Sequence, residues 1–113
     1  MNIDEYQEKA KKYDFFEETE DFNKVAFLEK VLGIVGEAGE TADKIKKIIR
    51  DKSGKPTDGD KVEITKELGD ILWYLVNIAR YMGVTMTEVA QMNLDKLESR
   101  RERNKLHGEG DNR

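Results

Sequence analysis

The chain has 113 residues, a length suited to one domain, and it contains no cysteine. Charged residues make up 39% of the sequence, yet the net charge is only -4, which argues against a general nucleic-acid-binding protein. The lack of cysteine excludes a disulfide framework and thiolate metal sites, and it fits the cytoplasm, where we expect the protein to act. Because no apolar run approaches roughly 20 residues and no signal-peptide pattern is present, we expect no membrane partner.

Helical periodicity is the main structural signal from the N-terminus onward. Asn2 is suited to cap a short first helix over residues 3–13, and residues 14–21 are predicted to form an irregular connection. A long second helix is predicted from about Asn23 to Arg50, because apolar residues recur there at helical spacing. These residues are Leu28, Val31, Leu32, Val35, Ala38, Ala42, Ile45 and Ile49.

The second half of the chain repeats the helical signal after one clear loop. Glycines and the single proline mark that loop at residues 51–60, and a third helix follows to about Met82. Gly83 is a suitable stop, and Thr85 with Glu88 forms a capping box for a fourth helix that ends near Lys105. With no strand alternation, the sequence predicts one all-α domain over residues 1–113, resembling a four-helix bundle, with a flexible tail at 106–113.

Two acidic pairs stand out because they lie inside apolar helical segments. Glu37 and Glu40 belong to the second helix, and Glu67 and Asp70 belong to the third. Residues three apart share a helix face, so antiparallel packing of these helices would bring four carboxylates together. Their repulsion would need compensation by a divalent cation, and hard oxygen donors suit Mg²⁺ or Mn²⁺. Since Mg²⁺ is commonly completed by substrate phosphates, a phosphorylated ligand is expected.

Glycines flank these acids, although each costs roughly 1 kcal/mol against alanine inside a helix. Gly36 directly precedes Glu37, Gly39 directly precedes Glu40, and Gly69 lies between Glu67 and Asp70. We predict that the missing Cβ atoms allow close approach of another helix and of a metal-bound ligand.

The helix faces that carry the acidic pairs also carry polar groups suited to a nucleotide. Lys44 and Lys47 follow the first acidic pair at helical spacing, and Tyr74 and Asn77 follow the second. The fourth helix presents an amide and basic groups at similar helical spacing. For the two lysines the alternative is ordinary pairing with nearby helix acids. The candidate substrate-binding residues are Lys44, Lys47, Tyr74, Asn77, Asn93, Lys96 and Arg100.

At these residues the sequence resembles the MazG-like nucleoside triphosphate pyrophosphohydrolases, an all-α superfamily with an E-x-x-E, spacer, E-x-x-D motif. The motif corresponds to Glu37/Glu40 and Glu67/Asp70, and the segments GEAGE, KELGDILWYL, NLDKLESR and GEGDNR are also similar to this family. The resemblance covers about residues 28–113.

The resemblance implies hydrolysis of a nucleoside triphosphate between the α- and β-phosphates, as nucleotide-pool housekeeping, with Mg²⁺ held by the four motif carboxylates. One carboxylate would act as general base, with the second-helix pair Glu37 and Glu40 favoured. Tyr74 matches a position near the nucleoside, and Asn93, Lys96 and Arg100 match positions for substrate contact. A homodimer or homotetramer is implied, and no residue set identifies a preferred base.

Two alternatives remain open. One is a non-enzymatic helical module that binds a partner protein or nucleic acid, and the other is a phosphohydrolase acting on a different pyrophosphate compound, such as a phosphoribosyl-ATP analogue. A separate hypothesis concerns the tail, which we predict to close over bound triphosphate as a lid. Deletion of the residues after Lys105 would then raise KM.

Overall fold

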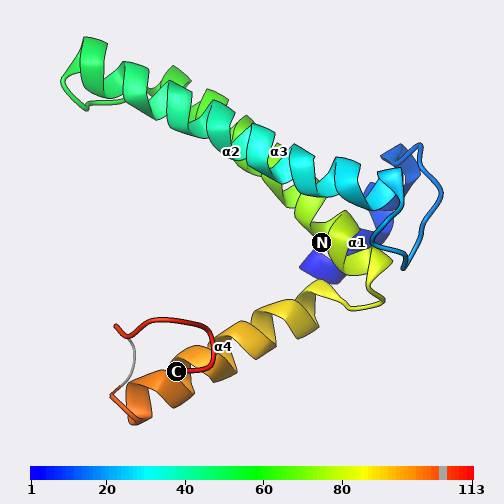
Figure 1. The fold of residues 1–113 in the computed structure, drawn as a ribbon. Helices are drawn as coiled ribbons and strands as arrows, with labels where there is room; N and C mark the ends of the chain where they lie inside the picture. The colour runs from blue at the N-terminus through cyan, green and yellow to red at the C-terminus, as the bar shows by residue number, and fades with distance from the viewer. Residues whose placement is uncertain (105–106) are drawn as a thin grey trace.

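The computed structural model describes residues 1–104 and 107–113, which contain four α-helices and no strand (Figure 1). The all-α class predicted from the sequence is therefore confirmed. None of the described helices is both long enough and apolar enough to cross a membrane. The elements in chain order are α1 (Ile3–Ala10), the 3₁₀ turn η1 (Lys11–Tyr13), α2 (Val25–Lys52), α3 (Asp58–Tyr81) and α4 (Met86–Glu102).

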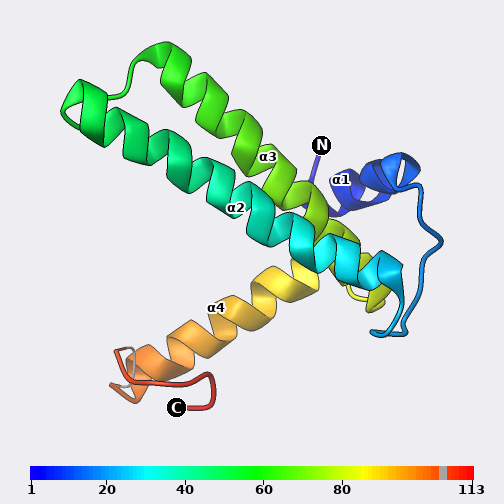
Figure 2. The ribbon, with the colours of Figure 1, turned by 45° about the horizontal axis from the view of Figure 1, so that its top comes forward.

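The two long helices α2 and α3 form an antiparallel hairpin, whereas α4 extends away from it (Figures 1 and 2). α1 packs against α3 and the first part of α4. The radius of gyration is 17.0 Å, compared with about 13 Å for a compact domain of this length. A single chain therefore does not close its helices into a compact bundle.

The seam between α2 and α3 follows one stripe on each helix. Phe27 lies against Tyr81 near one end, with ring centroids 6.1 Å apart, and the Lys52 ammonium lies 2.7 Å from Asp60 near the other. Along this seam the side chains are buried or half-buried. The α2 stripe consists of Phe27, Lys30, Ile34, Glu37, Thr41, Lys44 and Ile48. The α3 stripe consists of Ile64, Glu67, Ile71, Tyr74, Ile78 and Tyr81.

The apolar stripe that marks the second helix in the sequence does not face α3. Its large members are 40–66% exposed, and the polar stripe one residue over faces α3 instead. The predicted helix is confirmed, and its polar stripe can face α3 because charged residues pair across the hairpin. We call this exposed surface the outer stripe of α2; it consists of Leu28, Val31, Leu32, Val35, Ile45 and Ile49.

The core proper lies where α1, α3 and the start of α4 meet. Val76, Ala79 and Met86 are buried there. Gln7 joins these elements, since its side-chain amide donates to the carbonyls of Val76 and Val84 and accepts from the backbone N–H of Met86. The small core is consistent with the large fraction of α2 that remains exposed.

The helix boundaries predicted from capping signals agree closely with the structure. The Asn2 side chain accepts a hydrogen bond from the Glu5 backbone, and Thr85 and Glu88 form the expected capping box. Gly83 takes a φ of 72°, a left-handed conformation that ends α3 and favours glycine. These local signals place the start of α4 at the end of the hairpin, next to α1.

A buried ion cluster fixes the segment after α1 to the hairpin. The Lys30 side chain is 1% exposed, and its ammonium lies 2.9 Å from the equally buried Asp14 carboxylate. Arg80 approaches the other Asp14 oxygen at 2.8 Å, and the Tyr81 hydroxyl donates to that same oxygen. Burial alone would raise the pKa of Asp14, but hydrogen bonds from Tyr81 and Lys30 outweigh it and hold that pKa below its usual range. We call Asp14, Lys30, Arg80 and Tyr81 the Lys30 cluster.

Candidate active site

Three carboxylates meet in the middle of the α2–α3 seam. Glu37 projects from α2, and Glu67 and Asp70 project from α3, where their spacing places them on one face. One oxygen from each lies within 4.8 Å of the others. Glu37 and Glu67 are half-buried and Asp70 is exposed, so the site is open to solvent on one side. We call these three residues the carboxylate cluster.

Within the carboxylate cluster, Glu37 lies in an unfavourable environment for its ionised form. The pKa of Glu37 is raised, first by loss of solvation and then by the hydrogen-bonding and negative charge of Glu67 and the charges of Asp70 and Glu40. The nearest compensation is Lys44, whose ammonium lies 3.4 Å from a Glu67 oxygen. One lysine leaves the group net negative, which favours a cationic ligand.

The donor set fits a hard divalent ion. Carboxylate oxygens are the preferred ligands of Mg²⁺, Mn²⁺ and Ca²⁺. Two ligands at about 2.0–2.6 Å from one ion lie at most about 4–5 Å apart, and the spacing within the carboxylate cluster is similar. Glu40 is exposed one turn further along α2 and is not among the grouped carboxylates. Three of the four motif acids are therefore brought together in a group that can hold a metal ion.

Tyr74 lies one turn beyond Asp70, with its ring packed against α2. A Cβ atom on Gly33 would lie 2.2 Å from the ring atom Cε1, so the ring occupies the space that a side chain would need. The ring also meets Trp73 edge to face at 5.0 Å. The candidate nucleoside contact is thus half-buried in the seam next to the carboxylate cluster.

Within one chain, no other helix approaches the glycines that flank the acids. Apart from the neighbouring backbone of their own helices, no atom of the described residues would lie within 4 Å of a Cβ added to Gly36, Gly39 or Gly69. Close approach of a metal-bound ligand to these glycines stays a prediction. The close approach between helices occurs at Gly33, which we missed. The hairpin register would have revealed it, since Gly33 precedes Glu37 by one turn and Tyr74 follows Asp70 by one turn.

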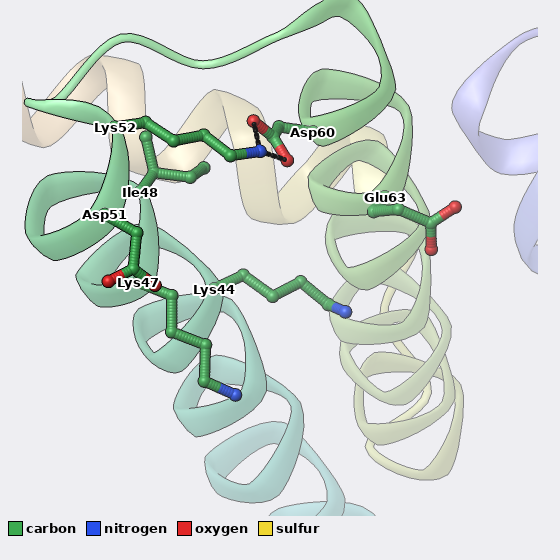
Figure 3. Close-up of a pocket in the computed structure, with 7 residues that line it drawn as sticks. All are labelled: Lys44, Lys47, Ile48, Asp51, Lys52, Asp60 and Glu63. Carbon is green, nitrogen blue, oxygen red and sulfur yellow. Dashed lines mark hydrogen bonds and ion pairs between the residues drawn. The ribbon is translucent and has the colours of Figure 1, made fainter.

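The two candidate lysines of α2 lie on the opposite side of the carboxylate cluster, beside a hollow of about 200 Å³ (Figure 3). Lys44 extends across the hollow toward α3, whereas Lys47 lies on the α2 side. The Lys47 ammonium pairs with Asp43 at 2.8 Å. Both lysines are thus paired with helix acids. The residues that line the hollow are Lys44, Lys47, Ile48, Asp51, Lys52, Asp60 and Glu63.

Asn77 is placed in the interior and not among the carboxylates. It is fully buried, its amide nitrogen donates to the Trp73 carbonyl at 2.9 Å, and its amide oxygen accepts from the Arg80 guanidinium. It therefore supports the Arg80 side of the Lys30 cluster. The sequence stripe grouped Asn77 with the acids of the third helix and did not predict its burial beside Trp73 and Arg80.

The candidates on α4 are not brought to the carboxylate cluster within one chain, because α4 leads away from the hairpin (Figure 1). Asn93 is exposed on this helix. The Lys96 ammonium lies 3.1 Å from the Asp111 carboxylate, and the buried Arg100 side chain donates to the carbonyl of Gly110 at 3.3 Å. The tail residues that the structure describes therefore contact α4.

Residues 105 and 106, where the fourth helix is predicted to end and the tail to begin, lie outside the described residues. The described tail, residues 107–113, folds back along α4 (Figure 2). Closure of the tail over a triphosphate stays a prediction.

The chain is thus an all-α protein in which an antiparallel helix pair carries a candidate metal site. The family model described as the MazG nucleotide pyrophosphohydrolase domain matches residues 27–104. The chain belongs to this family, which confirms the resemblance seen in the sequence. It is also 41% identical over 114 residues to the "Gene 37 protein" of Mycobacterium phage L5, covering 100% of both chains. No solved structure matches the chain.

Proposed function

We propose that this protein hydrolyses a nucleoside triphosphate at the α–β phosphate bond, in a Mg²⁺-dependent reaction that yields a monophosphate and pyrophosphate. The observation that supports it most strongly is the carboxylate cluster in a chain of the MazG nucleotide pyrophosphohydrolase family. The role would be nucleotide-pool housekeeping in the cytoplasm. Phosphate chains bring several negative charges, so a metal is needed to offset the repulsion from the acids.

Glu37, Glu67 and Asp70 would hold the metal, for which Mn²⁺ is a chemically suitable substitute. Bound there, Mg²⁺ would supply charge neutralisation at the phosphates and lower the pKa of the attacking water. Glu40 has the exposed position needed to accept a proton from that water, and Glu37, with its raised pKa, is the other candidate base.

The proposal includes an orientation for the substrate along the seam. Tyr74 lies on one side of the carboxylate cluster and Lys44 and Lys47 lie on the other, so the nucleoside would contact Tyr74 and the outer phosphates would extend toward the lysines. Lys44 has the shorter path because it already spans the seam. Asn77 would act through the packing of Trp73 and Arg80.

The active protein would be a homodimer or homotetramer. The outer stripe of α2 is an exposed apolar surface along much of a long helix, and Met92, Leu94 and Leu97 of α4 are exposed as well. A second copy would cover the outer stripe and bring Asn93, Lys96 and Arg100 of one subunit toward the carboxylates of another. Light scattering should then give at least a dimer, which Leu32→Glu shifts toward monomer. A monomeric wild type would contradict this part of the proposal.

The activity is tested with a panel of common and modified nucleoside triphosphates. Wild type should release pyrophosphate from at least one of them with Mg²⁺ but not with EDTA, and Glu40→Ala should lose most of that release. Including a phosphoribosyl-ATP analogue tests the other substrate class. Wild type that releases no pyrophosphate from any substrate would contradict the proposal.

The outer stripe is also the observation that favours the second candidate, a non-enzymatic interaction module. In that case the acids have no ligand, so Asp70→Asn would only relieve repulsion and raise stability. The same panel separates the two candidates, because a pure interaction module releases no pyrophosphate.

A further inference from the structure

Lys44 crosses the α2–α3 seam and contacts the carboxylate cluster. Its side chain starts on α2 and extends toward α3 (Figure 3), where its ammonium lies 3.4 Å from a Glu67 oxygen. The Lys44 side chain is 34% exposed and that of Glu67 is 15% exposed, so the pair lies at the solvent boundary. This cation therefore touches the edge of the carboxylate cluster directly.

The neighbouring lysines are directed to other acids. Lys46 and Lys47 both pair with Asp43 on α2 at 2.8 Å, and Lys66 pairs with Glu63 on α3 at 2.8 Å. Among the ion pairs of the described residues, Lys44–Glu67 is the one that involves the carboxylate cluster. Lys44 thus supplies the local compensation for three closely spaced acids.

We propose that Lys44 is a built-in counter-ion of the carboxylate cluster, which competes with the metal and is transferred to the phosphate chain when the metal binds. The proposal rests on the proposed function. In the metal-free chain the ammonium reduces the repulsion among the acids. A divalent ion at the same acids repels the ammonium, and the flexible lysine stem allows it to turn into the adjoining hollow.

This role has two consequences that a plain phosphate-binding lysine lacks. Removal of the Lys44 charge should tighten metal binding in the absence of nucleotide, because the competing cation is lost. It should also lower the stability of the metal-free protein and leave the metal-loaded protein unaffected. A lysine that contacts phosphate alone would alter neither property.

The experiment compares Lys44→Met with Lys47→Met, which removes the same charge one turn away from an ammonium paired with Asp43. Lys44→Arg retains the charge. Titration calorimetry with Mg²⁺ alone and thermal melts in EDTA and in saturating Mg²⁺ are the measurements. Lys44→Met should bind Mg²⁺ about three- to tenfold tighter and melt lower in EDTA only, as expected for loss of one ion pair at the solvent boundary. Lys47→Met and Lys44→Arg should match wild type.

Unchanged or weaker Mg²⁺ binding by Lys44→Met would overturn the counter-ion role, as would an equal gain in Lys47→Met. These outcomes are distinguishable from failure of the proposed function. If Lys44→Met tightens Mg²⁺ binding but the wild type releases no pyrophosphate, the proposed enzymatic activity is contradicted and the counter-ion role of Lys44 is kept. Pyrophosphate release by the wild type, together with unaltered Mg²⁺ affinity in Lys44→Met, would support the enzyme and contradict the counter-ion role.

Discussion

Two charged clusters lie on the same helix pair, two helical turns apart along α2, and they differ in how their charges are met. In the Lys30 cluster the buried Asp14 carboxylate is held by two cations and a hydroxyl donor. In the carboxylate cluster three acids face one another, and a single lysine contacts one of them. A buried charge with partners in its own chain makes the fold depend on those partners, whereas unbalanced charges open to solvent are candidates for binding a ligand.

The pKa of one acid in each cluster is shifted in the direction that this difference in compensation requires. The pKa of Asp14 is held below its usual range by hydrogen bonds that overcome burial, and the pKa of Glu37 is raised by burial and by its acidic neighbours. The fold is therefore stabilised by the ionised form of Asp14 and destabilised by the ionised form of Glu37 when no metal is bound.

The largest expected stability effect is in the Lys30 cluster. Asp14→Ala removes the buried carboxylate that Lys30, Arg80 and Tyr81 all contact and leaves Lys30 paired only with Glu29, so the free energy of unfolding should fall by about 3–5 kcal/mol. Urea denaturation at fixed protein concentration measures this. Glu17→Ala, an exposed acid in the same connecting segment, is the matched control and should alter stability by less than about 0.5 kcal/mol. Equal effects of the two variants would mean that Asp14 is not an anchor.

A smaller change in stability is expected from alanine substitutions at two glycines of α2, one in contact with a side chain of α3 and one without such a contact. Gly33→Ala places a Cβ atom against the Tyr74 ring and should cost about 1–3 kcal/mol despite the better helix propensity of alanine. Gly39→Ala, in the same helix, meets nothing within 4 Å and should gain up to about 1 kcal/mol. Thermal melts of both variants provide the comparison. If Gly39→Ala is destabilising instead, a second copy packs over Gly39, which would sharpen the proposed oligomer.

The smallest effect is in the pH dependence of stability in EDTA. The raised pKa of Glu37 means that its unfavourable contribution grows as pH rises from about 4.3, the usual glutamate value. Glu37→Gln should therefore weaken the decline in stability above that pH. The contribution of Asp14 has the opposite sign and is lost only as pH falls below the usual aspartate range. A wild type and a Glu37→Gln variant with parallel profiles would contradict the repulsion.

Much of the fold followed from local signals in the sequence. Periodicity and capping residues predicted the helices, and Thr85 with Glu88 and Gly83 fixed the start of α4. The face of α2 that meets α3 was not predictable from hydropathy, because Lys30, Glu37 and Lys44 occupy it. Those residues become compatible with the seam only through partners on other segments.

Local residue spacing predicted part of the candidate site, and the rest depends on tertiary packing. The acid spacing predicted that Glu67 and Asp70 share a face of α3, where Glu37 meets them, whereas Glu40 lies outside this group. The tilt of α4 away from the hairpin and the depth of Asn77 depend on tertiary packing around α1, which the stripe pattern does not encode.

The difference between the two clusters is tested most directly by one paired measurement on Asp70→Asn and Asp14→Asn. For each variant, Mg²⁺-dependent pyrophosphate release and the free energy of unfolding in EDTA are measured together. We predict that Asp70→Asn loses pyrophosphate release and keeps or gains stability, while Asp14→Asn loses stability. Wild-type levels of pyrophosphate release by Asp70→Asn would contradict the assignment of the carboxylate cluster as the active site.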